Sequence, residues 1–224
     1  MRATCSVWWM SDVFLLLPCA CLVAAGASSN SVSDKPPQDA CEHVSVRMVG
    51  FGESSAAPLE PDSVVAVVGY ARYVLRPDGL GYRRGVNGND GVFRLPLRAG
   101  ASLERAYLLI HRCNPVFAFE DGDGVSGSSR VVALNGSTLD RIWMSESMGL
   151  NLGPSVAIDG TLYITATGMV AGLDLATGTF RWRYAGLPSS SFDAPIVSDT
   201  TVRFPGSSGD TVIVDRATGR LATH

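Results

Sequence analysis

The sequence predicts an all-β protein, a partial β-propeller of about three to four four-stranded antiparallel blades that follows an N-terminal signal peptide and a flexible tether. Three observations predict it. A turn motif recurs about every 40 residues, Asp-Gly turn signals separate short apolar runs, and no apolar pattern of helical period persists. The blades are expected in residues 61–224, with clear repeats over 130–224.

The turn motif is clearest in GLDLATGTFRW at 172–182. Its Asp can accept hydrogen bonds from nearby backbone, its Gly permits a positive φ, and its Trp follows on the next strand. Similar segments are ALNGSTLDRIW at 133–143 and IVDRATGRLAT at 213–223. The three copies contribute Asn135, Thr138 and Trp143; Asp174, Thr177, Gly178 and Trp182; and Asp215, Thr218 and Gly219. Leu139 replaces the Gly of the first copy, and Thr223 replaces the Trp of the third.

Further signals support the same count. Pro115, Pro154 and Pro195 recur at a similar spacing, and each is expected to open a strand. Asp159-Gly160 between two apolar runs predicts a tight hairpin. A fainter copy of the motif, LPLRAGASL at 95–103, predicts one degenerate blade upstream.

The blade assignment also predicts the core. Trp143 and Trp182 should be largely buried. Five aliphatic residues should lie in the blade layers, namely Leu134, Val156, Ile164, Leu173 and Val212.

The motifs A-x-N-x-x-T-x-x-x-x-W at 133–143 and G-x-D-x-x-T-G-x-x-x-W at 172–182 resemble the pyrroloquinoline-quinone-like (PQQ-like) propeller repeat. The resemblance implies that Trp143 and Trp182 pack between adjacent blades and that the Asp, Thr and Gly residues hold the turn. The family includes quinoprotein dehydrogenases and the lipoprotein scaffold of the outer-membrane β-barrel assembly machinery, so the repeat does not by itself fix a function.

The resemblance associates quinone enzymes with a closed eight-bladed ring, an adjacent cysteine pair and a calcium site. This sequence has no adjacent cysteines and at most about four blades' length of chain. We therefore expect no cofactor. EDGDG at 120–124 and NGNDG at 87–91 lack the ligand spacing of a calcium loop and are interpreted as hairpin turns.

Catalytic groups form no recognisable constellation in the sequence. The histidines at 43, 111 and 224 are scattered, and His111 lies in the alternating strand AYLLIHRC. Asp174 and Asp215 are interpreted as turn residues rather than acid catalysts. With a net charge of −3 the chain has no basic field for nucleic acid, and the pair Arg83-Arg84 is expected to be solvated in a Gly-rich loop.

Residues 1–27 are interpreted as a signal peptide, because a short apolar run ends in Ala25-Gly26-Ala27, and residues 28–60 as a flexible tether. A lipoprotein signal at Cys21 is the competing interpretation, although Pro18 stands where such a motif has Leu. The protein is thus expected to be exported, periplasmic or extracellular, with membrane tethering through the N-terminus left open.

Cleavage after residue 27 would leave two cysteines, Cys41 and Cys113. In an oxidising compartment they could form one disulfide, and two buried or unpaired thiols remain the alternative.

Three functional hypotheses follow. The leading one is a non-enzymatic exported scaffold that binds another envelope or secreted protein, without nucleic acid or an identified small-molecule substrate. The second is part of a longer propeller completed by another chain, with self-association through open blade edges. The third is a quinone-dependent dehydrogenase fragment.

Overall fold

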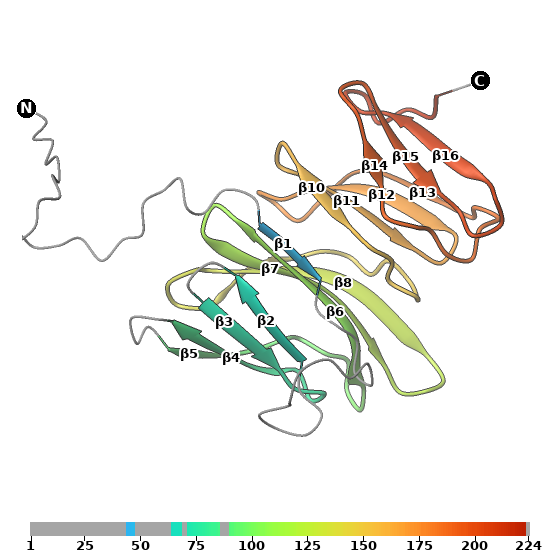
Figure 1. The fold of residues 1–224 in the computed structure, drawn as a ribbon. Helices are drawn as coiled ribbons and strands as arrows, with labels where there is room; N and C mark the ends of the chain where they lie inside the picture. The colour runs from blue at the N-terminus through green and yellow to red at the C-terminus, as the bar shows by residue number, and fades with distance from the viewer. Residues whose placement is uncertain (1–43, 48–63, 69–70, 86–89, 223–224) are drawn as a thin grey trace, which may run out of the picture. The chain divides into compact units, whose positions relative to one another are not determined.

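The computed structural model describes residues 44–47, 64–68, 71–85 and 90–222. These residues form sixteen β-strands and no helix, which confirms the all-β prediction. The strands lie in four antiparallel sheets, which we call blades 1 to 4 in chain order (Figure 1).

Within each blade, strands that follow one another in the sequence pair as neighbours. Blade 1 contains β2 (Val64–Val68), β3 (Ala71–Leu75), β4 (Leu80–Gly85) and β5 (Gly91–Arg94). Blade 2 contains β6 (Ser102–His111), β7 (Asn114–Gly122), β8 (Gly127–Leu134) and β9 (Arg141–Met144). Blade 3 contains β10 (Val156–Ile158), β11 (Thr161–Ala166), β12 (Met169–Asp174) and β13 (Phe180–Ala185). Blade 4 contains β14 (Ile196–Val197), β15 (Thr201–Pro205) and β16 (Thr211–Asp215).

Blade 2 has a fifth strand from far upstream. β1 (Val44–Arg47) pairs antiparallel with β6, so that Val44 lies opposite Ile110. These four residues fall within the 28–60 range that the sequence predicts to be a flexible tether. Their backbone belongs instead to a sheet.

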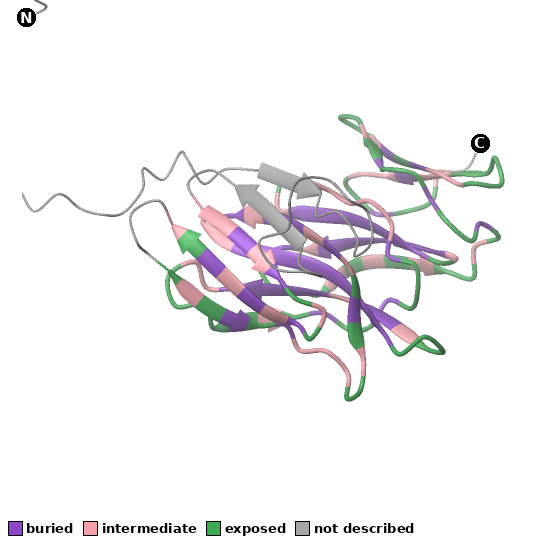
Figure 2. Ribbon diagram, turned by 60° about the horizontal axis from the view of Figure 1, so that its bottom comes forward, coloured by how far each residue is buried: buried purple, intermediate pink, exposed green. Residues whose placement is uncertain are grey.

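Apolar side chains fill the space between consecutive blades. One buried cluster joins blades 1 and 2 through Leu75, Phe93 and Phe117 among others. A second joins blades 2 and 3, and a third joins blades 3 and 4. Buried residues therefore occupy both faces of the middle blades and alternate with exposed ones in blade 1 (Figure 2).

The predicted core is confirmed in part. Leu134, Ile164 and Leu173 are buried. Val156 and Val212 are only half-buried. Val156 lies on β10 and Val212 on β16, which are outer strands of their sheets. An outer strand has only one neighbouring strand, so its side chains are less covered.

One detail of the predicted repeat is wrong. The segment 95–103 is not a blade turn but the connection from β5 to β6 and the start of β6. Pro115, the second residue of β7, lies at the start of a strand as expected, but this strand is inside blade 2, whereas Pro154 and Pro195 precede the first strands of blades 3 and 4. The β7–β8 hairpin of blade 2 is longer than the β11–β12 hairpin of blade 3, so equal spacing of the prolines does not mean equivalent positions.

Two buried carboxylates hold the chain between the blades. Glu120 accepts hydrogen bonds from the backbone N–H groups of Asn151 (2.6 Å) and Leu152 (3.0 Å) on the way to blade 3. Asp121 accepts from the backbone N–H of Arg98 at 2.6 Å and from its Nε at 3.3 Å. Since both carboxylates are buried, these donors offset the cost of removing charge from water.

The expectation that Arg83 and Arg84 are solvated in a loop is wrong for Arg83. Both residues lie in β4, and Arg83 is buried. Its guanidinium donates hydrogen bonds to the carbonyl oxygens of Gly136 and Ser137 in blade 2. Arg84 is exposed, because successive side chains of a strand point to opposite faces.

Within the described part of the chain, no helix has the length and apolar character that a membrane span requires.

The β1–β6 register bears on the two cysteines. Val44 lies opposite Ile110 and Arg47 opposite Tyr107. β6 ends at His111, and Cys113 lies in the β6–β7 turn with a φ of 65°, close to the Val44 end of the β1–β6 pairing. Cys41 lies outside the described residues, so the Cys41–Cys113 disulfide stays a prediction.

We expect the oxidised protein to give one disulfide-linked peptide that joins Cys41 to Cys113, detected by mass spectrometry after alkylation without reductant. Cys41→Ser should make Cys113 accessible to alkylation and lower the free energy of unfolding by about 2–5 kcal/mol, because the cross-link closes a long loop. Alkylation of both cysteines in the unreduced wild type would contradict the pairing.

Candidate functional site

The turns that follow the third strands of blades 2, 3 and 4, namely β8, β12 and β16, share one hydrogen-bond pattern. In each turn the Asn or Asp side chain accepts from a Thr backbone N–H three residues later. The distances are 3.0 Å for Asn135–Thr138, 3.1 Å for Asp174–Thr177 and 2.8 Å for Asp215–Thr218. The next N–H, of Leu139, Gly178 or Gly219, donates to the carbonyl of the same Asn or Asp. The motif residues thus meet within each turn.

Each motif tryptophan lies on the turn glycine of the following blade. A Cβ atom on Gly178 would overlap the ring of Trp143, and one on Gly219 would overlap the ring of Trp182. Both glycines have positive φ, 74° and 71°. The turn of one blade is therefore the seat for the indole of the blade before it.

Both motif tryptophans are half-buried. Trp182 lies among three aromatic rings, with centroids 6.2 Å from Tyr163, 5.9 Å from Tyr184 and 6.0 Å from Phe204. The hydroxyl of Tyr184 donates to the Gly219 carbonyl at 2.7 Å. This bond joins blade 3 to the same turn that seats Trp182.

The interface between blades 1 and 2 uses a different pair of residues. Leu139 stands in the turn at φ 64°, a conformation that disfavours a side chain, and is buried. Its side chain lies where a Cβ on Gly91 would be, beside Phe93 in the same cluster. In this interface a turn leucine packs on a glycine of the preceding blade, and this contact takes the place of a tryptophan that packs on a turn glycine.

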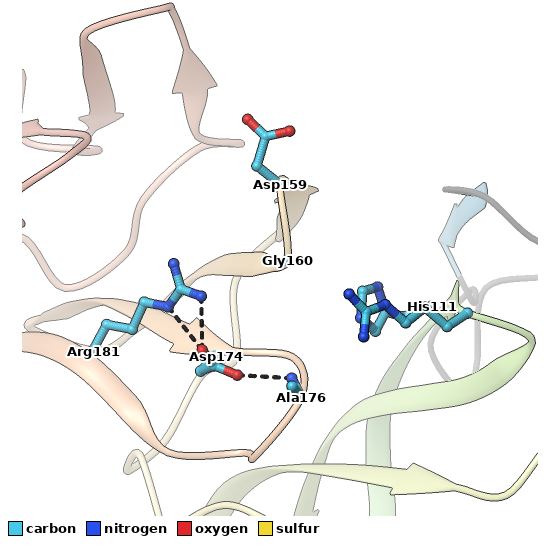
Figure 3. Close-up of a pocket in the computed structure, with 7 residues that line it drawn as sticks. His111, Asp159, Gly160, Asp174, Ala176 and Arg181 are labelled. Carbon is cyan, nitrogen blue, oxygen red and sulfur yellow. Dashed lines mark hydrogen bonds and ion pairs between the residues drawn. The ribbon is translucent and has the colours of Figure 1, made fainter.

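A pocket of about 320 Å³ opens among the turns of blades 2 and 3. Its lining comes from the β6–β7 hairpin, the β10–β11 hairpin and the motif turn of blade 3. The lining residues are His111, Arg112, Asp159, Gly160, Asp174, Ala176 and Arg181. Figure 3 shows Arg181 directed at Asp174, with His111 across the pocket and Asp159 pointing away from Asp174.

The carboxylates of this pocket are engaged in ion pairs. Asp174 accepts from Arg181 Nη2 at 2.7 Å and Nε at 3.0 Å. The hydrogen bond from Arg181 holds the pKa of Asp174 below its usual value, so this group stays ionised and has no proton to donate near neutral pH. Asp159 pairs with Arg216 in the turn of blade 4. The Asp159–Arg216 pair joins the turns of blades 3 and 4.

The acidic segment 120–124 forms a hairpin end rather than a cation loop. Asp123 accepts from the N–H groups of Val125 (3.0 Å) and Ser126 (2.7 Å). These bonds lower the pKa of Asp123 to about 2. Glu120 and Asp121 are engaged with backbone groups and Arg98, as described above. Of the segment 87–91, residues 87–89 lie outside the described residues, and Asp90 accepts from the Gly85 N–H at 3.2 Å.

Among the described residues, no three His, Cys, Asp or Glu side chains are grouped so that they could hold a metal ion. The chain also lacks the adjacent cysteines that the resemblance associates with quinone. His43 and His224 lie outside the described residues.

Sequence reasoning missed the exposed outer edge of blade 2. Of the residues whose burial is described, seven are exposed large hydrophobic ones, and four of these belong to blade 2 and the connection after it: Val125, Ile142, Met144 and Leu150. Ile142 and Met144 lie on the edge strand β9. In contrast, Arg181 and Arg183 on the edge strand β13 form ion pairs with Asp174 and Glu146. A signal was present, because RIWM offers two apolar residues at the positions that FRWR fills with arginine.

Comparison with known proteins identifies the repeat. Residues 114–224, about half of the chain, match a family model described as outer membrane protein assembly factor BamB. No functionally curated protein matches the chain.

Solved structures share the fold at low identity. BamB from Moraxella catarrhalis is 17% identical with a TM-score of 0.53, and the match covers 80% of this chain and 65% of that one. A quinohemoprotein alcohol dehydrogenase from Comamonas testosteroni is 15% identical with a TM-score of 0.50, covering 80% of this chain and 36% of that one. A second such dehydrogenase, from Pseudomonas putida, gives 16% and 0.50, covering 71% and 33%. The fold is that of a partial propeller, and the chain spans less than two thirds of these relatives' length.

Because Trp143 packs on Gly178, alanine substitutions at two glycines of blade 3 should differ in their effect on stability. Gly178→Ala should lower the free energy of unfolding by about 1–3 kcal/mol more than Gly186→Ala, because only the first new Cβ meets a tryptophan ring. The two glycines have almost equal φ, 74° and 75°, so backbone strain is matched. Urea unfolding of both variants measures the difference, and equal losses would show that the ring contact contributes nothing.

Proposed function

We propose that this chain, whose residues 114–224 belong to the PQQ-like β-propeller repeat family, is a non-enzymatic scaffold that binds another protein in the cell envelope. The observation that carries the proposal is the exposed apolar edge of blade 2. Ile142 is 48% exposed and Met144 38% exposed on a strand whose outer side pairs with no other described strand. Such an edge suits a partner that adds an extended segment and covers the apolar side chains.

The neighbouring blade supports a specific use of this edge. β13 has the same place in blade 3 but carries Arg181 and Arg183, charged residues that discourage strand addition. Of these two outer strands, β9 is therefore the one better suited to strand addition by a partner. A rigid frame of docked blades would hold this edge without the cost of ordering a loop.

The envelope location is likewise our proposal. It is supported by the predicted leader at 1–27 and by the family description, which refers to outer membrane protein assembly. A non-enzymatic role is supported by Asp174, Glu120 and Asp121, each of which is committed to a turn or a connection.

The strand-edge proposal predicts position-specific crosslinking. A photoreactive amino acid at Ile142 should join the chain to one envelope protein in intact cells, identified by mass spectrometry. The same residue at Arg183 is the matched control, since it is also exposed on an outer strand, and should give no such product. An identical set of products from both positions would contradict a partner at β9.

A second candidate is a blade set completed by blades of another chain. It is favoured by blade 4, in which only three strands are described, and by the 65% coverage of the Moraxella BamB. The sequence resemblance and the dehydrogenase structures keep the quinone enzyme as a weaker alternative.

Light scattering on a sizing column, with a thermal melt, distinguishes the first two. We expect the purified chain to be a monodisperse species with one cooperative melt, because three buried clusters already join its four blades. Polydisperse aggregate without a transition would contradict a self-sufficient scaffold and favour completion by another chain.

A further inference from the structure

Blade 1 has a sheet face that points away from blade 2. Tyr73, Leu75 and Phe93 are buried in the cluster with blade 2. Since successive side chains alternate along a strand, the intervening residues lie on the opposite face. We call this the arginine face: Arg72, Val74, Tyr82, Arg84, Val92 and Arg94.

The strand register arranges these residues in rows. Val74 lies opposite Tyr82, which lies opposite Val92, and this row forms an apolar stripe across three strands. On one side of the stripe Arg72 lies directly opposite Arg84. On the other side, Arg94 lies at the end of β5 beside Leu80.

The corresponding face of an inner blade is different. In blade 3, Leu162, Ile164 and Leu173 fill the cluster with blade 2 and are fully buried. The arginine face has guanidinium groups around its apolar row instead. Covering them with an apolar blade would remove several charges from water without compensation, at a cost of several kcal/mol for each. An ordinary blade therefore does not fit here.

Two of the three arginines on this face have no acidic partner among the described residues. Arg72 and Arg84 are like charges in directly opposed positions, which is unfavourable. In the described part of the chain neither forms an ion pair, and the Nε of Arg72 is buried without a hydrogen-bond acceptor. Arg94, in contrast, donates to the Asp78 carbonyl at 2.9 Å and lies 3.9 Å from its carboxylate.

The side chains between the arginines differ in exposure. Val92 is 61% exposed, and Val74 and Tyr82 are half-buried. An apolar stripe flanked by guanidinium groups suits a segment with apolar side chains between carboxylates. Arginine is well matched to carboxylates, because its planar group can donate two parallel hydrogen bonds.

We propose that the arginine face binds an acidic protein segment, whose carboxylates pair with Arg72 and Arg84 and whose apolar side chains cover Tyr82 and Val92. This inference rests on the proposed scaffold function and adds the chemistry of a partner. The two valines of the stripe favour protein over nucleic acid, as does the net charge of −3.

The test uses a fluorescent peptide of alternating glutamate and valine, with glutamine–valine and lysine–valine peptides as probes of charge. Anisotropy with the full chain should show binding of the glutamate peptide alone. Arg84→Gln should weaken that binding about tenfold, the effect of losing one charge-assisted hydrogen bond. Arg183→Gln is the matched control, since Arg183 is another exposed strand arginine, and should leave binding unchanged.

A thermal melt keeps the test independent of folding. Arg84→Gln should not lower the melting temperature, because it removes a like-charge contact with Arg72. Equal binding of the three peptides, equal weakening by both substitutions, or displacement of the peptide by duplex DNA at lower concentration than by free glutamate peptide would overturn the proposal.

The outcome is separable from that of the scaffold function. A crosslinked partner at Ile142 together with no peptide binding would overturn the arginine face alone. Loss of both signals would count against the scaffold function itself.

Discussion

The seating of an indole ring on the turn glycine of the next blade is the contact on which the blade array depends. It occurs at Trp143–Gly178 and again at Trp182–Gly219. The turn can accept the ring only because its Asp or Asn side chain holds the backbone in shape and its glycine has no Cβ. One short segment thus fixes both a local turn and the packing of two sheets. Between blades 1 and 2 the turn residue is the larger one, Leu139, and its side chain packs on Gly91 of β5. The space between these two blades is therefore filled by a leucine instead of a tryptophan.

The parts of the fold that depend on local chemistry could be predicted from the sequence. The Asp159-Gly160 hairpin has positive φ at both residues, 48° and 72°, as an Asp-Gly turn between strands requires. Residues 95–103 were misassigned because the hairpin of blade 2 is longer than that of blade 3, and spacing alone does not show where the added length lies. The burial of Glu120 and Arg83 could not be predicted either. Their hydrogen-bond partners are backbone groups far away in the sequence, and the local sequence does not indicate which groups these are.

The outward faces of blades 1 and 4 share a mixture of aliphatic and guanidinium side chains. On the face of blade 4 that points away from blade 3, Arg203 lies between Ile196 and Ile213 in the register. The arginine face of blade 1 has the same mixture of aliphatic and guanidinium groups. These surfaces are recognised only once the strand register is known, because a single arginine in a strand has no meaning until its cross-strand neighbours are identified.

The pairing of β1 with β6 has a kinetic consequence. The strands of every other pair are adjacent in the sequence, whereas Val44 meets Ile110 only after the whole of blade 1 has intervened. At the 5–20 residues per second typical of synthesis, β6 is made on the order of several seconds after β1. Hairpins form in microseconds, so blade 1 can fold while β1 still lacks its neighbour. Of the strand pairs described, β1–β6 joins the residues farthest apart in the sequence, so it is expected to form last. A chain in which this pair has not formed would present β1 as an unpaired strand to chaperones or to other nascent chains.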